Sequence, residues 1–201
     1  MIRAIIFDFG GVLVRMTDDS PRRKLAEQLG ISLSSLDDLV FFSDSAKKAG
    51  NGEISVGKHW QEVGKTLGIR EDAMPDFLQQ YWSADDVNWE LLEYIRGLRP
   101  KYKVGLLSNA WDDLRNTLHN RWHIDDLFDE LVISAEVGMI KPDPRIFHLA
   151  VDRLGVLPQE AVFIDDMSAN VQAACQEGLT GILYQNTPQV LEALKLLLDE
   201  G

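Results

Sequence analysis

Short apolar runs alternate with helical patterns along the second half of the chain, and this alternation limits the fold more than any other feature. The runs that read as strands are 103–108, 130–134, 161–165 and 181–184, and the helical patterns are 89–98, 112–122, 144–154, 168–177 and 189–198. Strands separated by helices of about 10 to 15 residues form βαβ units, whose strands lie parallel. The pattern predicts an α/β fold with a Rossmann-like parallel sheet flanked by helices.

A further apolar run, residues 3–7, begins near the N-terminus and leads directly into Asp8. The run shows little alternation of polar and apolar positions, as expected for a strand buried on both faces of a parallel sheet. A carboxylate at the C-terminal end of such a strand lies where open α/β sheets bind ligands. Considered alone, Asp8 could also be only a turn or cap residue at the end of a strand.

Residues 16–86 differ from the rest, because their patterns are helical and none of them reads as a strand. The expected helices are 21–30, 35–49, 56–68 and 73–82. We therefore predict an all-helical cap domain, residues 16–86, inserted into an α/β core domain made of residues 1–15 and 87–201.

Composition narrows the class of partner and the location of the protein. The formal net charge of −12 argues against a nucleic-acid surface and against docking on an anionic membrane. No apolar run approaches the roughly 18 to 20 residues of a membrane span, and Asp8 interrupts the apolar stretch that a signal peptide would need. We expect a cytoplasmic protein that binds neither nucleic acid nor membranes. The sequence does not predict its oligomeric state.

Three other predicted strands also lead into polar residues: Ser108-Asn109, a loop that reaches Lys141, and Asp165-Asp166. The C-terminal ends of parallel strands meet at one edge of the sheet, so these side chains are expected to converge on Asp8. Three carboxylates supply the hard oxygen ligands that Mg²⁺ takes together with substrate phosphate. A hydroxyl, a backbone amide and a lysine supply donors for phosphoryl oxygens, and a carboxylate can itself be the nucleophile.

Two neighbouring residues leave alternatives open. Asn170, shortly after Asp165-Asp166, could reach the same site or face solvent. Trp111, directly after Ser108-Asn109, could line a substrate pocket or serve only as a packing anchor.

These residues, in this order, resemble the four motifs of the haloacid dehalogenase (HAD) superfamily: Asp8, Ser108, Lys141 and Asp165-Asp166. The chain is similar to members with a helical cap after the first motif, such as the N-terminal phosphatase domain of epoxide hydrolases and bacterial sugar-phosphate phosphatases. The resemblance covers roughly residues 1–15 and 88–185. It implies a Mg²⁺-dependent phosphatase that hydrolyses a small phosphorylated metabolite, such as a sugar phosphate, through an aspartyl-phosphate.

The same resemblance assigns roles to single residues. It implies that Asp8 is the nucleophile and a Mg²⁺ ligand, with the Gly10 carbonyl and the Asp166 carboxylate as the other protein ligands of the metal. Asp165 would hold Lys141 or an outer-sphere water.

The remaining implied roles concern the phosphoryl group of the substrate. Ser108 and the backbone amide of Asn109 would bind this group. Lys141 would contact it as well, and would neutralise charge between it and Asp8.

One position departs from the family pattern. The phosphatases of this family usually carry a second aspartate two residues after the nucleophile, as general acid and base, and Gly10 stands there in this chain. The loss of a general acid typically costs roughly 10²- to 10⁴-fold in rate. The departure predicts a slow phosphatase, or one whose substrate has a good leaving group, such as a sugar 1-phosphate or an acyl phosphate.

Two rival functions remain open at this point. A metal-independent 2-haloacid dehalogenase also has a non-acidic residue two places after its aspartate, but it has little use for the adjacent pair Asp165-Asp166. A non-catalytic phosphate-binding or regulatory protein of the same fold is favoured by Gly10 alone.

Overall fold

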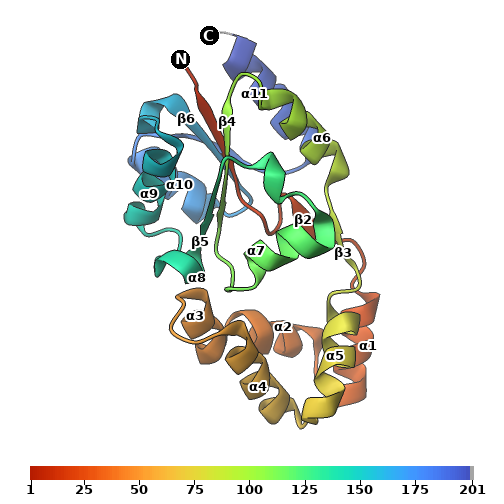
Figure 1. Ribbon diagram of the computed structural model, residues 1–201. Coiled ribbons are helices and arrows are strands. Elements are labelled where there is room, and N and C mark those ends of the chain that lie inside the picture. Colours follow the sequence, from red (N-terminus) through yellow and green to blue (C-terminus); the bar gives the residue numbers. More distant parts are fainter. Residues whose placement is uncertain (200–201) are drawn as a thin grey trace.

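The computed structural model describes residues 1–199 and is built around a five-stranded sheet (Figure 1). The strands are β1 (Ala4–Phe7), β4 (Lys103–Ser108), β5 (Glu130–Ile133), β6 (Ala161–Asp165) and β7 (Thr180–Leu183). They lie in the order β5-β4-β1-β6-β7, and every neighbouring pair is parallel. The predicted parallel sheet is confirmed. Residues 200 and 201, which the predicted core domain includes, lie outside the described residues.

Helices cover both faces of this sheet and explain why β1 shows no alternation in sequence. Helices α6 (Trp89–Leu98) and α11 (Thr187–Asp199) lie on one face, and α9 (Pro144–Leu154) and α10 (Ser168–Gln176) lie on the other (Figure 1). Side chains at positions 5 and 7 pack into the first apolar cluster, and those at positions 4 and 6 pack into the second. Every residue of β1 is therefore buried, as is usual for parallel sheets with two covered faces.

Five helices form a separate layer beside the C-terminal edge of the sheet, and we call this layer, residues 20–81, the helical segment (Figure 1). They are α1 (Ser20–Leu29), α2 (Leu33–Phe41), α3 (Asp44–Gly50), α4 (Val56–Leu67) and α5 (Met74–Tyr81). The segment has an apolar cluster of its own, which contains Leu36, Trp60 and Val63. The prediction of one helix over 35–49 is wrong, because the chain breaks at Phe42 and the Ser43 hydroxyl accepts a hydrogen bond from Ala46 N at 3.2 Å, which starts α3.

A two-stranded antiparallel ribbon joins the helical segment to the rest of the chain. It consists of β2 (Val14–Met16) and β3 (Asp85–Val87), so the prediction that residues 16–86 contain no strand is wrong. The buried Arg22 of α1 ties the ribbon to the segment, because its Nη2 donates to Asp85 Oδ1 at 2.7 Å and its Nε donates to the Tyr81 carbonyl at 3.1 Å.

The remaining elements are short. They are α7 (Leu114–Thr117), the π-helical turn η2 (Leu118–Trp122), α8 (Ser134–Val137), and the 3-10 turns η1 (Glu71–Ala73), η3 (Asp125–Leu127) and η4 (Pro158–Glu160). The helix predicted over 112–122 is thus a single α-helical turn that continues as a π-helical turn. Among the described residues, no helix is long and apolar enough to cross a membrane.

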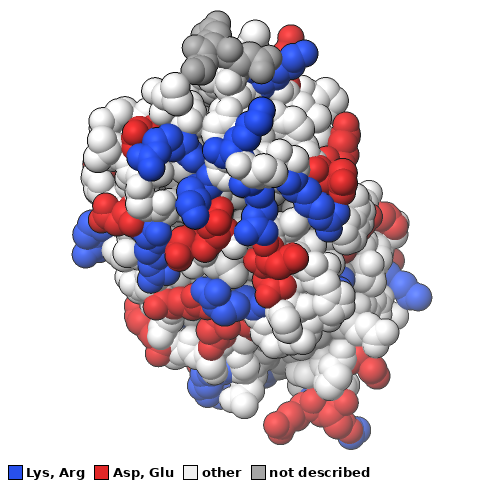
Figure 2. Space-filling model, turned by 45° about the horizontal axis from the view of Figure 1, so that its top comes forward, with Lys and Arg blue, Asp and Glu red and all other residues white. Residues whose placement is uncertain are grey.

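Basic and acidic side chains are interleaved over the face shown in Figure 2. Many surface charges of the molecule are paired, as in Arg96–Glu93 at 2.7 Å and Lys103–Asp129 at 3.4 Å. Exposed pairs of this kind contribute little to stability, with a median of about 0 to 1 kcal/mol. Because the two signs are interleaved, the face in Figure 2 does not present a field of one sign, in spite of the large net negative charge of the chain.

Candidate active site

The register of the central strands brings Asp8 and Asp165 together. Phe7 of β1 lies opposite Ile164 of β6, and Asp8 N donates to the Ile164 carbonyl at 2.8 Å. The next residues on the two strands are therefore neighbours at the C-terminal edge of the sheet. Both carboxylates are buried there, with 7% of Asp8 and 0% of Asp165 exposed to solvent.

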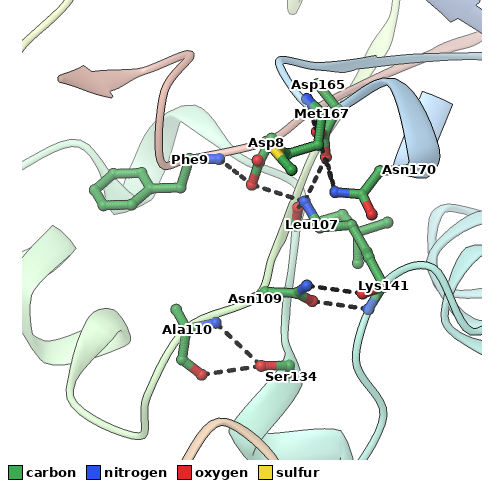
Figure 3. A network of polar contacts seen from close by, with 10 residues as sticks. All are labelled: Asp8, Phe9, Leu107, Asn109, Ala110, Ser134, Lys141, Asp165, Met167 and Asn170. Atoms are coloured by element: carbon green, nitrogen blue, oxygen red, sulfur yellow. Dashed lines mark hydrogen bonds and ion pairs between the residues drawn. The ribbon is translucent and has the colours of Figure 1, made fainter. Parts of the chain in front are cut away.

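Lys141 reaches this pair from the loop between α8 and α9 (Figure 3). Its Nζ lies 2.8 Å from Asp8 Oδ1 and 2.7 Å from Asp165 Oδ2, and it donates to the Leu107 carbonyl at 2.9 Å. An ammonium group has three N–H donors, so these three acceptors occupy all of them. The predicted meeting of Asp8, Lys141 and Asp165 is therefore seen in the structure, with the ammonium directed at carboxylates and a carbonyl.

Both carboxylate oxygens of Asp165 accept hydrogen bonds from other groups of the chain. Its Oδ1 accepts from Met167 N at 2.7 Å, and Asn170 Nδ2 lies 3.1 Å from Oδ1 and 3.0 Å from Oδ2. Together with Lys141, these donors use both carboxylate oxygens. Asn170 is buried and points into the site rather than to solvent, which decides the alternative left open by the sequence.

The carboxylate of Asp166 is the more accessible member of the acidic pair. One oxygen from each of Asp8, Asp165 and Asp166 lies within 4.8 Å of the others, a spacing compatible with a single metal ion. Gly11 allows this arrangement, because a Cβ at its position would lie 2.1 Å from Asp166 Oδ2. Gly11 also has a φ of 78°, in the left-handed region that favours glycine.

The balance of charge at the site favours a bound cation. Three carboxylates face a single ammonium group, which leaves two negative charges unless a proton or a cation is bound. Burial, opposed by Lys141 and reinforced by Asp165, raises the pKa of Asp8 from 3.8 to about 7. Burial and the neighbouring Asp165 also raise the pKa of Asp166. A divalent cation with hard oxygen ligands, such as Mg²⁺, fits both this charge and these donors.

The end of β4 and the loop that follows it carry the predicted phosphoryl-binding residues. Ser108 is buried at the end of β4, next to the strand that carries Asp8. Asn109 directs its side chain toward the backbone of Lys141 (Figure 3), where Nδ2 donates to the carbonyl at 3.0 Å and Oδ1 accepts from the amide at 2.8 Å. The sequence carries no signal for this contact, which joins residues 32 positions apart.

Trp111, which could have lined a substrate pocket, packs mainly against the helical segment. Its ring stacks on Phe41 at 6.1 Å and lies 4.9 Å from His59 and 5.5 Å from Trp60. The next residue, Asp112, accepts a hydrogen bond from Val56 N, at the start of α4, at 2.9 Å. The loop that begins at Ser108 therefore also anchors the helical segment.

Comparisons with known proteins show what the whole chain is similar to. A model of haloacid dehalogenase-like hydrolases matches residues 2–178. A D-ribitol-5-phosphate phosphatase of Bacteroides thetaiotaomicron is 29% identical over 99% of this chain and 100% of its own length. The bifunctional epoxide hydrolase 2 of Mus musculus is 31% identical over 61% of this chain, which spans only 23% of that protein. A HAD family enzyme of Bacteroides thetaiotaomicron, solved in complex with magnesium and inorganic phosphate, superposes with a TM-score of 0.77 and 23% identity, over 92% of this chain and 95% of that one.

Proposed function

The chain belongs to the haloacid dehalogenase-like hydrolases, and we propose that it is a Mg²⁺-dependent phosphatase acting on a small phosphorylated metabolite. The observation that carries this proposal is the cluster of Asp8, Lys141, Asp165 and Asp166 at the C-terminal edge of the sheet, with Ser108 beside it. The D-ribitol-5-phosphate phosphatase, which aligns over nearly the whole chain, supports a sugar or polyol phosphate as the substrate class.

We assign the metal ligands from the partners that each carboxylate already has. Asp165 is fully engaged by Lys141, Asn170 and Met167 N, so it supports the site without binding the cation directly. Asp8 and Asp166 retain free oxygens, and with the Gly10 carbonyl they would hold Mg²⁺. The bound cation would supply charge neutralisation for the phosphoryl oxygens.

The reaction itself needs Asp8 as a carboxylate. A carboxylate oxygen of Asp8 attacks phosphorus, the bond from phosphorus to the ester oxygen breaks, and the leaving group takes a proton from water. Water then attacks phosphorus of the aspartyl-phosphate, which releases inorganic phosphate and regenerates Asp8. Lys141 stabilises the ionised form of Asp8, while Ser108 and the Asn109 backbone amide donate to the phosphoryl oxygens.

The helical segment would act as a cap over this site. We propose the boundaries 16–86 for the cap and 1–15 with 87–201 for the core, with the β2–β3 ribbon as the connection on which the cap moves. Its place beside the C-terminal edge of the sheet supports this role (Figure 1). Closure of such a cap excludes water and completes the substrate pocket.

The proposal is tested with a panel of sugar, polyol and acyl phosphates and a generic aryl phosphate, assayed with Mg²⁺ and with a chelator. We expect turnover that requires Mg²⁺ and is abolished by the chelator. The excess of negative charge at the site and its carboxylate oxygens both favour the binding of a cation. Chloropropionate is assayed in parallel. Release of chloride without metal, in the absence of phosphatase activity, would instead identify a dehalogenase.

A Gly11→Ala substitution is expected to weaken Mg²⁺ binding by about 10- to 100-fold, because its Cβ would displace the Asp166 carboxylate. The matched control is Gly10→Ala, whose Cβ meets no atom within 4 Å and whose carbonyl is unchanged. Isothermal titration calorimetry with Mg²⁺ measures both variants. Equal affinity in the two variants would contradict the assignment of Asp166 as a ligand.

A further inference from the structure

The Asn109 side chain makes a two-point contact with the backbone of a single residue, Lys141 (Figure 3). The carboxamide donates to the Lys141 carbonyl at 3.0 Å and accepts from the Lys141 amide at 2.8 Å. Because a backbone amide can only donate and a carbonyl can only accept, this pairing also fixes the orientation of the carboxamide.

Lys141 lies in a part of the chain that has no regular structure to hold it. Residues 138–143 connect α8 to α9 and belong to neither helix. The lysine side chain is long and flexible, yet its Nζ is held between Asp8 and Asp165 with only 1% of the side chain exposed. The position of the ammonium group therefore depends on where the loop holds the Lys141 backbone, and Asn109 provides two hydrogen bonds at that point.

We propose that the Asn109 side chain is a positioning residue that acts through Lys141. By holding the Lys141 backbone, it sets the ammonium group at the distance from Asp8 that the reaction requires. This role is separate from the binding of substrate by the Asn109 backbone amide. Its catalytic consequence rests on the phosphatase function proposed above, whereas the control of Lys141 position does not.

Ser134, the first residue of α8, provides a matched control for Asn109. It is fully buried, and its Oγ both accepts from Ala110 N and donates to the Ala110 carbonyl, each at 3.0 Å. Ser134 thus holds the residue after Asn109 with two hydrogen bonds of similar length but makes none to Lys141. Loss of either side chain removes two partly buried hydrogen bonds. Because Ser134 is fully buried and Asn109 is exposed, Ser134→Ala should be destabilised at least as much as Asn109→Ala.

The kinetic experiment compares Asn109→Ala with Ser134→Ala. We expect Asn109→Ala to lower kcat by about 10- to 100-fold and to leave KM nearly unchanged, because a small displacement of a catalytic group is costly while substrate contacts remain. Ser134→Ala should lose at least as much thermal stability, with a much smaller change in kcat. Equal losses of kcat in both variants, or a raised KM with kcat retained in Asn109→Ala, would overturn the proposal.

A second measurement needs no turnover. An amine-acylating reagent is applied to the folded proteins, and the modification rate of Lys141 is followed by mass spectrometry. We expect slow modification in the native protein and in Ser134→Ala, and modification at least several-fold faster in Asn109→Ala. Unchanged protection of Lys141 in Asn109→Ala would refute the positioning role. Faster labelling in a protein that hydrolyses no phosphate ester would refute the proposed function alone.

Discussion

Substitution of Asp8 by asparagine is expected to lower phosphatase turnover by a factor on the order of 10⁴ or more, because the variant has no carboxylate to attack phosphorus. The loss should not come from unfolding. Burial already raises the pKa of Asp8 to about 7, so the folded protein without metal holds this ionised group at a cost. A neutral group of the same size removes that cost, and Lys141 keeps Asp165 and the Leu107 carbonyl as partners.

The measurement is steady-state turnover with the best ester of the panel, together with mass spectrometry of the quenched enzyme. Native enzyme should show a phosphorylated species that Asp8→Asn lacks. The exposed Asp72, in the 3-10 turn η1 before α5, offers a control, and Asp72→Asn should match the native rate. Turnover retained in Asp8→Asn would exclude an aspartyl-phosphate at this residue.

The second large effect is an increase in kcat. Replacement of Gly10 by aspartate is expected to raise kcat by about 10²-fold or more for alkyl esters, which leave poorly without a proton. Aryl and acyl phosphates, whose leaving groups need no proton, should gain little. The site has room for the new side chain, because a Cβ at position 10 would meet no atom within 4 Å.

The control for this gain is Gly10→Asn, which has the same size but cannot transfer a proton. Rates of both variants across esters with leaving groups of graded pKa separate proton donation from a change in binding. A rise only in Gly10→Asp, and largest for the poorest leaving groups, confirms the missing acid. If the native protein and Gly10→Asp both lack activity on every ester, the non-catalytic phosphate-binding role becomes the better explanation.

The sheet could be predicted from the sequence because its strands are buried on both faces. Residues 104–107 and 161–164 contain no polar side chain, and this composition by itself indicates a central parallel strand. The ribbon of β2 and β3 could not be predicted in the same way. Each of its strands has only three residues, and Arg15, Asp85 and Asp86 occupy half of the positions, so no apolar run marks them.

At the site, the sequence predicted which strand ends meet, but it did not predict which side chains contact one another there. Asp8, Lys141 and Asp165 could be predicted to converge because parallel strands end at one edge. The contact of Asn109 with the Lys141 backbone depends on how two loops cross. No periodicity or local motif records that contact, because both loops lack regular structure.

The five residues from Ser108 to Asp112 contain the proposed phosphoryl contacts at one end and the anchor of the helical segment at the other. Trp111 and Asp112 belong to the α/β core by sequence, yet both contact the helical segment and anchor it to the core. If residues 16–86 were replaced by those of a relative in order to change specificity, the new segment would therefore meet Trp111 and Asp112 without the partners that these two residues have here. A functional chimera has to exchange positions 111 and 112 together with residues 16–86. The part of this chain that can be replaced as a unit is therefore made of two separate stretches of sequence.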